Sequence, residues 1–208
     1  MSQGKVEDLI ERYQKGRLTS KEAYEDLKKQ GFVEHERWEF IPWVIYFLLL
    51  LLPTWAGALK LDFLEWFAEL QRFYFPMTVI YISIAFVAIG TLFIIWGCVS
   101  HRKRGGLHMA GETLIFYRED LFRVMRHPAV TGVVIWVILL PIILSPIISF
   151  TYLSIGAIAI NIIRIPWGIR MEEKLSIAKW GDEYRRYMKE VPRFNFILGL
   201  WRLRNKSR

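Results

Sequence analysis

Hydrophobic and polar positions are segregated along this chain. Charged residues are concentrated in residues 1–39, 101–126 and 164–208, and long apolar runs occupy the intervals between them. A helix at the surface of a soluble domain instead alternates apolar and polar positions, because only one of its faces is buried. Apolar runs that alternate with charged segments therefore predict membrane-spanning helices with water-exposed connections.

Four apolar runs predict four spans: 38–59, 77–99, 130–148 and 150–163. Crossing the hydrocarbon core takes roughly 20 residues of helix, so the first two runs match this length well. The last two runs are interrupted only by Ser145, Pro146 and Ser149, which predicts a tight hairpin of membrane helices. The aromatic, amphipathic segment 60–75 predicts an additional helix at the membrane interface.

Residues 1–37 predict a soluble helical hairpin ahead of the membrane domain 38–208. Val6, Leu9, Ile10 and Tyr13 recur at helical spacing. Gly16 can end the first helix, Thr19 with Glu22 forms a capping box for a second, and Gly31 can close it. No cluster of catalytic side chains is present here, so we expect the hairpin to mediate self-association or a protein contact.

The distribution of basic residues predicts the orientation. Two Lys or Arg residues lie in 60–75 and six in 101–126, and the tail beyond Arg164 is strongly basic. With four spans, the positive-inside rule places the N-terminus, the 101–126 segment and the C-terminus in the cytoplasm. The predicted fold class is all-α: a polytopic membrane bundle of about four spans with cytoplasmic C-terminal helices over 168–208.

Composition narrows the functional classes. The net charge of +8 is better explained by basic residues beside membrane segments than by nucleic-acid binding, so no nucleic-acid partner is expected. The single cysteine, Cys98, excludes an internal disulfide. His101 and His108 lack Cys or acidic partners at metal-binding spacing, so no metal site is expected. No glycine-rich dinucleotide turn or Walker loop occurs.

Two short motifs carry candidate chemistry. Arg126-His127-Pro128 precedes the third span, where both side chains either direct donors at an anion beside a helix N-terminus or anchor the helix at the interface. Glu172 and Glu173 follow the fourth span and cannot share one helical face. One carboxylate can point inward to attract a sulfonium, accept from an ammonium or hold ribose hydroxyls, whereas a fully solvated pair is the alternative.

Two further motifs follow: Gly181-Asp182-Glu183-Tyr184 and Val191-Pro192-Arg193-Phe194. With Arg126-His127-Pro128 and Glu172-Glu173, their order and spacing over residues 110–196 resemble the isoprenylcysteine carboxyl methyltransferase family and the related phospholipid N-methyltransferases. The resemblance covers less than half of the chain, and the hairpin 1–37 has no part in it.

The resemblance implies an S-adenosylmethionine (SAM) site. Its expected cofactor-binding residues are Leu114, Phe122, Arg126, His127, Pro128, Ala129, Val130 and Glu172, with Glu173 close behind. Phe122 stands where the family usually has Tyr. The family's substrate-orienting Arg falls on Gly168, so Arg164 or Arg170 is expected to replace it, and these two with Glu173 are the candidate catalytic residues.

The expected activity is methyl transfer from SAM to a lipid-like substrate that enters from the bilayer. A sulfonium methyl is already activated, so the site mainly has to align donor and nucleophile. A carboxylate acceptor of the isoprenylcysteine type needs no general base, whereas a phosphatidylethanolamine-type amine must lose a proton. The sequence leaves O-methylation ahead of N-methylation, with a non-enzymatic membrane adaptor as the third possibility.

Overall fold

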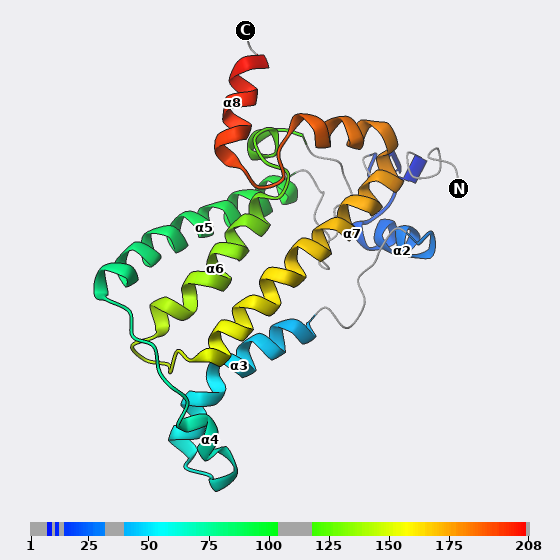
Figure 1. The fold of residues 1–208 in the computed structure, drawn as a ribbon. Coiled ribbons are helices and arrows are strands. Elements are labelled where there is room, and N and C mark those ends of the chain that lie inside the picture. Colours follow the sequence, from blue (N-terminus) through cyan, green and yellow to red (C-terminus); the bar gives the residue numbers. More distant parts are fainter. Residues whose placement is uncertain (1–7, 10, 13–14, 32–39, 104–117, 207–208) are drawn as a thin grey trace. The chain divides into compact units, whose positions relative to one another are not determined.

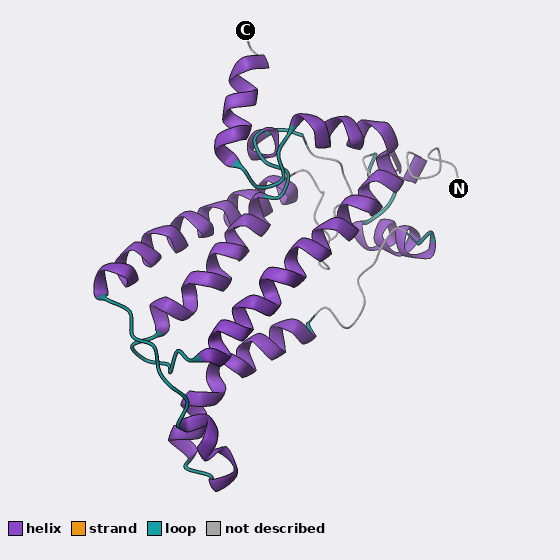
Figure 2. Ribbon diagram, viewed as in Figure 1, coloured by secondary structure: helices purple, strands orange, loops and turns teal. Residues whose placement is uncertain are grey.

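The structure is a computed structural model that describes residues 8–9, 11–12, 15–31, 40–103 and 118–206. Within these ranges all regular elements are helices, and no strand occurs (Figure 2). The chain forms two compact units. Unit 1 comprises Met1–His35, Phe93–Ala129 and Ile169–Arg208, and unit 2 comprises Glu36–Leu92 and Val130–Gly168.

Unit 2 contains α3 (Ile41–Leu59) and parts of α5 (Met77–Lys103), α6 (Pro128–Leu144) and α7 (Tyr152–Glu190). The stretches of these helices within unit 2 run alongside one another (Figure 1). In α3 the buried residues form a narrow stripe: Tyr46, Leu50, Pro53 and Ala56. Large apolar side chains on its other faces are exposed, as a helix surrounded by lipid requires.

Three of the described helices are long and apolar enough to cross a membrane: α3, Met77–Ser100 of α5, and α7. This confirms the predicted all-α class and indicates membrane association. The predicted third span, 130–148, is a shorter apolar helix, because α6 begins at Pro128 and ends at Leu144. The turn 145–151 follows, where Thr54 Oγ1 accepts a hydrogen bond from the backbone N–H of Ser149 at 2.8 Å.

Helices in unit 2 approach one another closely. A Cβ atom added at Gly90 of α5 would lie 3.1 Å from the Ile135 side chain of α6. The Tyr46 hydroxyl of α3 donates to the Val137 carbonyl of α6 at 3.0 Å, and Trp136 Nε1 donates to Thr91 Oγ1 at 3.0 Å. Small residues and a few interhelical hydrogen bonds are the usual means of packing helices in lipid.

The segment 60–75 differs from the single interfacial helix that the sequence predicts. Its helical parts are one 3₁₀ turn, η1 (Asp62–Leu64), and the short α4 (Glu65–Ala68). The chain then extends towards Pro76, which disfavours helix at the preceding residue. Phe73 N–H donates to the Phe150 carbonyl at 2.8 Å, so the extended part is held against the turn before α7. Several aromatic rings remain exposed, including Phe63, Trp66 and Tyr74.

In unit 1, the second helix of the N-terminal hairpin begins as predicted. The helix α2 (Ser20–Lys29) has a complete capping box between Thr19 and Glu22. Gly16 and Gly31 have φ values of 69° and 76°, which favour glycine at helix ends. Leu9, Ala23 and Leu27 are buried. Val6, Ile10 and Tyr13 lie outside the described residues.

The helix α7 does not end with the apolar run. It continues through Gly168 to a kink at Gly181, where φ is 53° and ψ is −128°. A change from apolar to charged residues marks a change of solvent, and nothing in residues 164–180 interrupts helical hydrogen bonding except Pro166. Of the 21 residues 170–190, eleven are Asp, Glu, Lys or Arg, so this part lies outside the apolar span. Beyond the kink, α7 continues to Glu190. A short loop then leads to α8 (Phe196–Lys206), the last helix of the described chain.

Candidate functional site

The side chain of Glu173 is at the centre of a charged cluster in unit 1. It projects from the polar part of α7 and is 4% exposed. Its Oε1 lies 3.3 Å from Arg126 NH1 and 3.3 Å from His127 Nε2. Arg193 binds the same carboxylate through two nitrogens, with Nε donating to Oε1 at 3.1 Å and NH2 donating to Oε2. A buried carboxylate thus has three basic neighbours.

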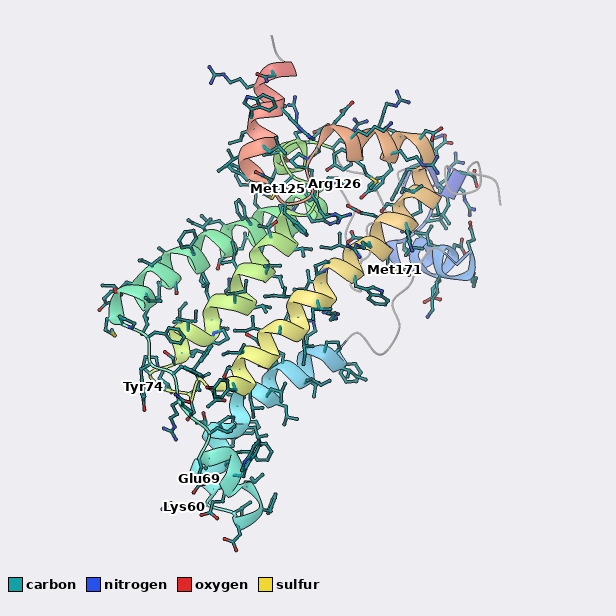
Figure 3. All side chains as sticks on the ribbon, in the orientation of Figure 1. Lys60, Glu69, Tyr74, Met125, Arg126 and Met171 are labelled. Carbon is teal, nitrogen blue, oxygen red and sulfur yellow. The ribbon has the colours of Figure 1, made fainter. Side chains whose placement is uncertain are left out.

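The segment 118–127 positions Arg126 and His127. It includes the 3₁₀ turn η2 (Asp120–Arg123) and ends where Pro128 begins α6. Its backbone pairs with the segment after α7, because Arg126 N–H donates to the Pro192 carbonyl at 3.0 Å and His127 N–H to the Arg193 carbonyl at 3.2 Å. These two bonds connect the predicted Arg-His-Pro and Val-Pro-Arg-Phe motifs. Figure 3 labels Arg126 on this segment and Met171, the residue before Glu172, on α7.

His127 lies between the two glutamates. Because an ionised carboxylate only accepts hydrogen bonds, the contact with Glu173 places a proton on His127 Nε2. On the other side of the ring, Nδ1 is 3.6 Å from Glu172 Oε2, too long for a direct hydrogen bond. The side chain of Glu172 is 52% exposed, against 4% for Glu173. The structure therefore separates the adjacent pair into an inner and an outer carboxylate.

The charges around Glu173 govern its protonation. Burial alone would raise the pKa of this carboxyl, but hydrogen bonds from His127 and Arg193, with the charges of Arg126 and His127, lower the pKa to about 2. Glu173 is therefore an anion at neutral pH, and its proton affinity is too low for it to act as a general base.

Arg126 retains unused hydrogen-bonding capacity. Its side chain is 8% exposed, and in the described part of the chain neither Nε nor NH1 has a hydrogen-bond acceptor of suitable geometry. The NH1 contact with Glu173 is a charge contact only. A buried donor without an acceptor costs about 1–3 kcal/mol. Two such donors on one guanidinium make Arg126 a suitable site for an anionic ligand group.

An aromatic cluster supports the site. Tyr184, Tyr187 and Val191 are buried together beyond the Gly181 kink. Burial raises the pKa of the Tyr187 hydroxyl, which stays protonated and donates to the Phe122 carbonyl at 2.7 Å. Arg118 lies over the Tyr187 ring, with 5.6 Å between its Cζ and the ring centroid. The 118–127 segment is thus attached to the last part of α7 at several points.

The other predicted residues fall in different places. Phe122 is buried, and the Tyr187 bond uses its backbone. Pro128 is fully buried at the start of α6, and Ala129 lies against Gly97, where an added Cβ would be 3.2 Å from the Ala129 backbone nitrogen. Val130 belongs to unit 2. Leu114 lies outside the described residues.

The two candidate substitutes for the missing arginine also differ. Arg164 belongs to unit 2, where its guanidinium lies over the Trp43 ring at 5.7 Å from the centroid. Arg170 is in unit 1, exposed, one helical turn before Glu173 and Lys174. The basic side chains that contact Glu173 are instead those of Arg126, His127 and Arg193.

Sequence reasoning did not identify Arg193 as a site residue. It was named only as part of the Val-Pro-Arg-Phe motif, and its approach to Glu173 depends on the chain reversing direction after Glu190. The signal that could have found it is a basic residue flanked by two apolar positions, Pro192 and Phe194. The Phe194 ring lies 6.2 Å from the His127 ring, centroid to centroid.

In the described residues, fold and site together define an all-helical membrane-associated protein with a buried charged cluster in unit 1. In the described part of the chain, no group of three or more His, Cys, Asp or Glu side chains is arranged to hold a metal ion. No protein-family model, curated protein or solved structure matches this chain.

Proposed function

We propose that this chain is an integral membrane methyltransferase that transfers a methyl group from SAM to a lipid-like carboxylate. The observation that carries the proposal is the convergence of Arg126 and His127 with Glu172 and Glu173 in one unit. The Arg-His pair and the Glu-Glu pair are more than 40 positions apart in the sequence. Both pairs belong to the motifs by which the chain resembles the isoprenylcysteine carboxyl methyltransferase family.

The charges of the site suit the polar parts of SAM. The donors of Arg126 that lack acceptors fit a carboxylate, such as that of the methionine part of SAM. The half-exposed Glu172 carboxylate fits an ammonium or a sulfonium. When bound, SAM supplies a methyl group that is already activated, so the protein has to bind, align and exclude water. Glu173, held by Arg193, fixes the positions of His127 and Arg126.

The protonation of Glu173 favours a carboxylate acceptor over an amine. Methylation of a carboxylate needs no base, whereas an amine must lose its proton. Glu173 has a pKa of about 2 and cannot take that proton at neutral pH. N-methylation of a phosphatidylethanolamine-type headgroup would require His127 or Glu172 as the base, which makes it the second candidate.

The proposed topology brings the two substrates together. It has four spans, with α6 as the shortest, and it places the N-terminus, the 101–126 segment and the C-terminus in the cytoplasm. SAM then reaches unit 1 from the cytoplasm, and the apolar acceptor enters from the bilayer. In this arrangement Arg170, close to the end of the apolar run, is the preferred acceptor-orienting residue, and Arg164 is the alternative.

Binding of labelled SAM to the detergent-purified protein tests the proposal. We expect His127→Ala and Glu172→Ala each to weaken binding by at least about tenfold, since each removes a polar contact worth about 1.5–3 kcal/mol. Glu69→Ala, which removes an exposed carboxylate of unit 2, is the matched control and should bind normally. Unchanged affinity in both site variants would refute the assignment of these residues. Absence of SAM binding by the native chain would favour a membrane adaptor.

The acceptor is tested separately. The protein is incubated with SAM labelled on its methyl group and either a farnesylcysteine analogue or phosphatidylethanolamine. Label in the farnesylcysteine analogue, lost in Arg170→Ala with SAM affinity retained, would support O-methylation and the role of Arg170. Label only in phosphatidylethanolamine would replace it with N-methylation.

A further inference from the structure

The last helix, α8, presents an apolar face that nothing in the described chain covers. Ile197, Leu200 and Trp201 are 80%, 44% and 60% exposed. Their spacing of three and four residues places them on one face. Exposed apolar side chains are expected on the spans of a membrane protein, but α8 follows the charged part of α7 and is too short to be a span.

The opposite face of α8 is firmly packed, so this exposure does not reflect a loosely attached helix. Gly199 is so close to the 118–127 segment that an added Cβ would overlap the backbone carbonyl of Val124. Arg202 NH1 donates to the Lys189 carbonyl at 3.1 Å, at the end of α7. Asn195 Oδ1 accepts from Leu198 N–H at 2.9 Å and caps the first turn. These contacts fix the rotation of α8 and direct Ile197, Leu200 and Trp201 outwards.

The first turn of α8 is also next to a candidate span. The ring of Phe196 lies 5.8 Å from that of Phe93, centroid to centroid. Phe93 belongs to the apolar stretch Met77–Ser100 and lies seven residues before its end. That separation corresponds to about 10 Å along a helix. The exposed face of α8 therefore begins beside the last turns of a membrane helix.

The positive charge of α8 and its flanking residues indicates that the partner is an anionic membrane surface. From Arg193 to the C-terminal residue the sequence has five Lys or Arg residues and no Asp or Glu. Apolar residues including Trp on one face, with basic residues beside them, are typical of helices that lie in the plane of a membrane interface. Anionic headgroups attract juxtamembrane basic segments.

We propose that α8 is an interfacial helix, with Ile197, Leu200 and Trp201 among the lipid chains and its basic residues near anionic headgroups. This surface is separate from the Glu173 cluster, and the inference does not depend on methyl transfer. It would also anchor unit 1 at the bilayer surface, because Gly199 and Arg202 attach α8 to the rest of that unit.

Spin-label accessibility in the full-length protein tests this proposal. Labels are placed at Ile197→Cys, Trp201→Cys or Asp182→Cys in a Cys98→Ser background and reconstituted in nanodiscs of phosphatidylcholine with phosphatidylglycerol. We expect oxygen to be the more effective relaxing agent at positions 197 and 201, and a water-soluble nickel complex at position 182, an exposed site in the charged part of α7. Predominance of the nickel complex at all three positions would overturn the proposal.

Two further measurements decide whether the partner of this face is anionic lipid or a second copy of the chain. In nanodiscs of phosphatidylcholine alone, the undocked fraction should rise about fivefold for each basic residue that loses its headgroup attraction. An unchanged oxygen-to-nickel contrast would remove the role of anionic lipid. If the labels at position 197 are shielded only when a nanodisc holds two copies, with coupling between them, the face is a contact between chains and the lipid proposal is wrong. No arm uses SAM, so failure here is distinguishable from failure of the proposed activity.

Discussion

The two units differ in the charge of their main polar contacts, because unit 2 uses neutral hydrogen bonds, some within one helix and a few between helices, and unit 1 uses ion pairs. In unit 2, Ser83, Thr91 and Asn161 each donate to the carbonyl four residues earlier in their own helix. In unit 1, the central polar contacts join distant segments, as between Glu173 and the residues Arg126 and Arg193. Helices in lipid have no water to compensate an imperfect contact, so local bonds are the safest solution. Long-range ion pairs, and with them the candidate chemistry, are found where α7 has left the apolar span.

Removing the central carboxylate should produce the largest difference between the units. In Glu173→Gln, Arg126 and Arg193 lose their anionic partner, and breaking a buried ion pair in this way costs about 3–5 kcal/mol. Hydrogen exchange measured by mass spectrometry should show unit 1 opening more often while α3 in unit 2 keeps its protection. Glu172→Gln is the matched control and should change stability by no more than about 0.5 kcal/mol. Equal effects of the two variants would contradict the inner and outer assignment.

The second largest difference is expected at acid pH, where unit 1 should lose more stability than unit 2. The pKa of Glu173 is lowered from its usual 4.5 to about 2 in the folded chain, so the folded state binds this proton less readily than the unfolded state. Its stabilising contribution, about 3 kcal/mol, is complete above pH about 4.5 and is lost as the pH falls towards about 2. Exchange in unit 1 should therefore accelerate across this window, and in Glu173→Gln the acceleration should be smaller. The same acid profile in both proteins would assign the effect to other groups.

Adding one methyl group tests the packing of each unit. Gly199→Ala places a Cβ on the Val124 backbone carbonyl, which cannot move aside, and should destabilise unit 1 by about 1–3 kcal/mol. Gly90→Ala in unit 2 brings a Cβ to 3.1 Å from Ile135 Cγ2 and 3.2 Å from the Gly132 carbonyl, a milder approach, and gains helix propensity of about 1 kcal/mol, so its loss should be smaller than that of Gly199→Ala. Thermal unfolding in detergent measures both. A larger loss for Gly90→Ala would reverse the comparison.

The smallest effect is expected from a single interhelical bond in unit 2. Tyr46→Phe removes the hydrogen bond to the Val137 carbonyl and should cost about 1 kcal/mol. Trp136→Phe, which removes the bond to Thr91, should cost a similar amount or less, because Trp136 is more exposed. Losses as large as that of Glu173→Gln would show that unit 2 also depends on a few polar contacts.

The sequence predicted those parts of the fold that local rules determine. The apolar runs gave α3, α5, α6 and the first part of α7, and the capping box marked the start of α2. The kink in α7 falls at Gly181, whose backbone conformation is one that only glycine adopts readily. The predicted start of separate C-terminal helices at residue 168 was wrong, because α7 continues through Gly168 and a change of solvent does not end a helix.

The candidate site was predictable only in part, because its geometry depends on contacts between segments. Helical geometry showed that Glu172 and Glu173 cannot share one face, but which of them points inward depends on the rotation of α7 relative to the 118–127 segment. The role of Arg193 depends on the two backbone bonds that join its segment to Arg126 and His127. No local pattern encodes either of these, which is why Arg193 was missed.

The late position of Arg193 has a consequence for biosynthesis. Chains fold from the N-terminus as they are synthesised, and the apolar helices precede this residue. Until Arg193 has been made, Glu173 lacks its two-nitrogen partner and the Arg126 backbone lacks the Pro192 carbonyl. Membrane insertion can therefore be finished before the charged cluster closes, so the nascent protein reaches the membrane before its candidate site is complete.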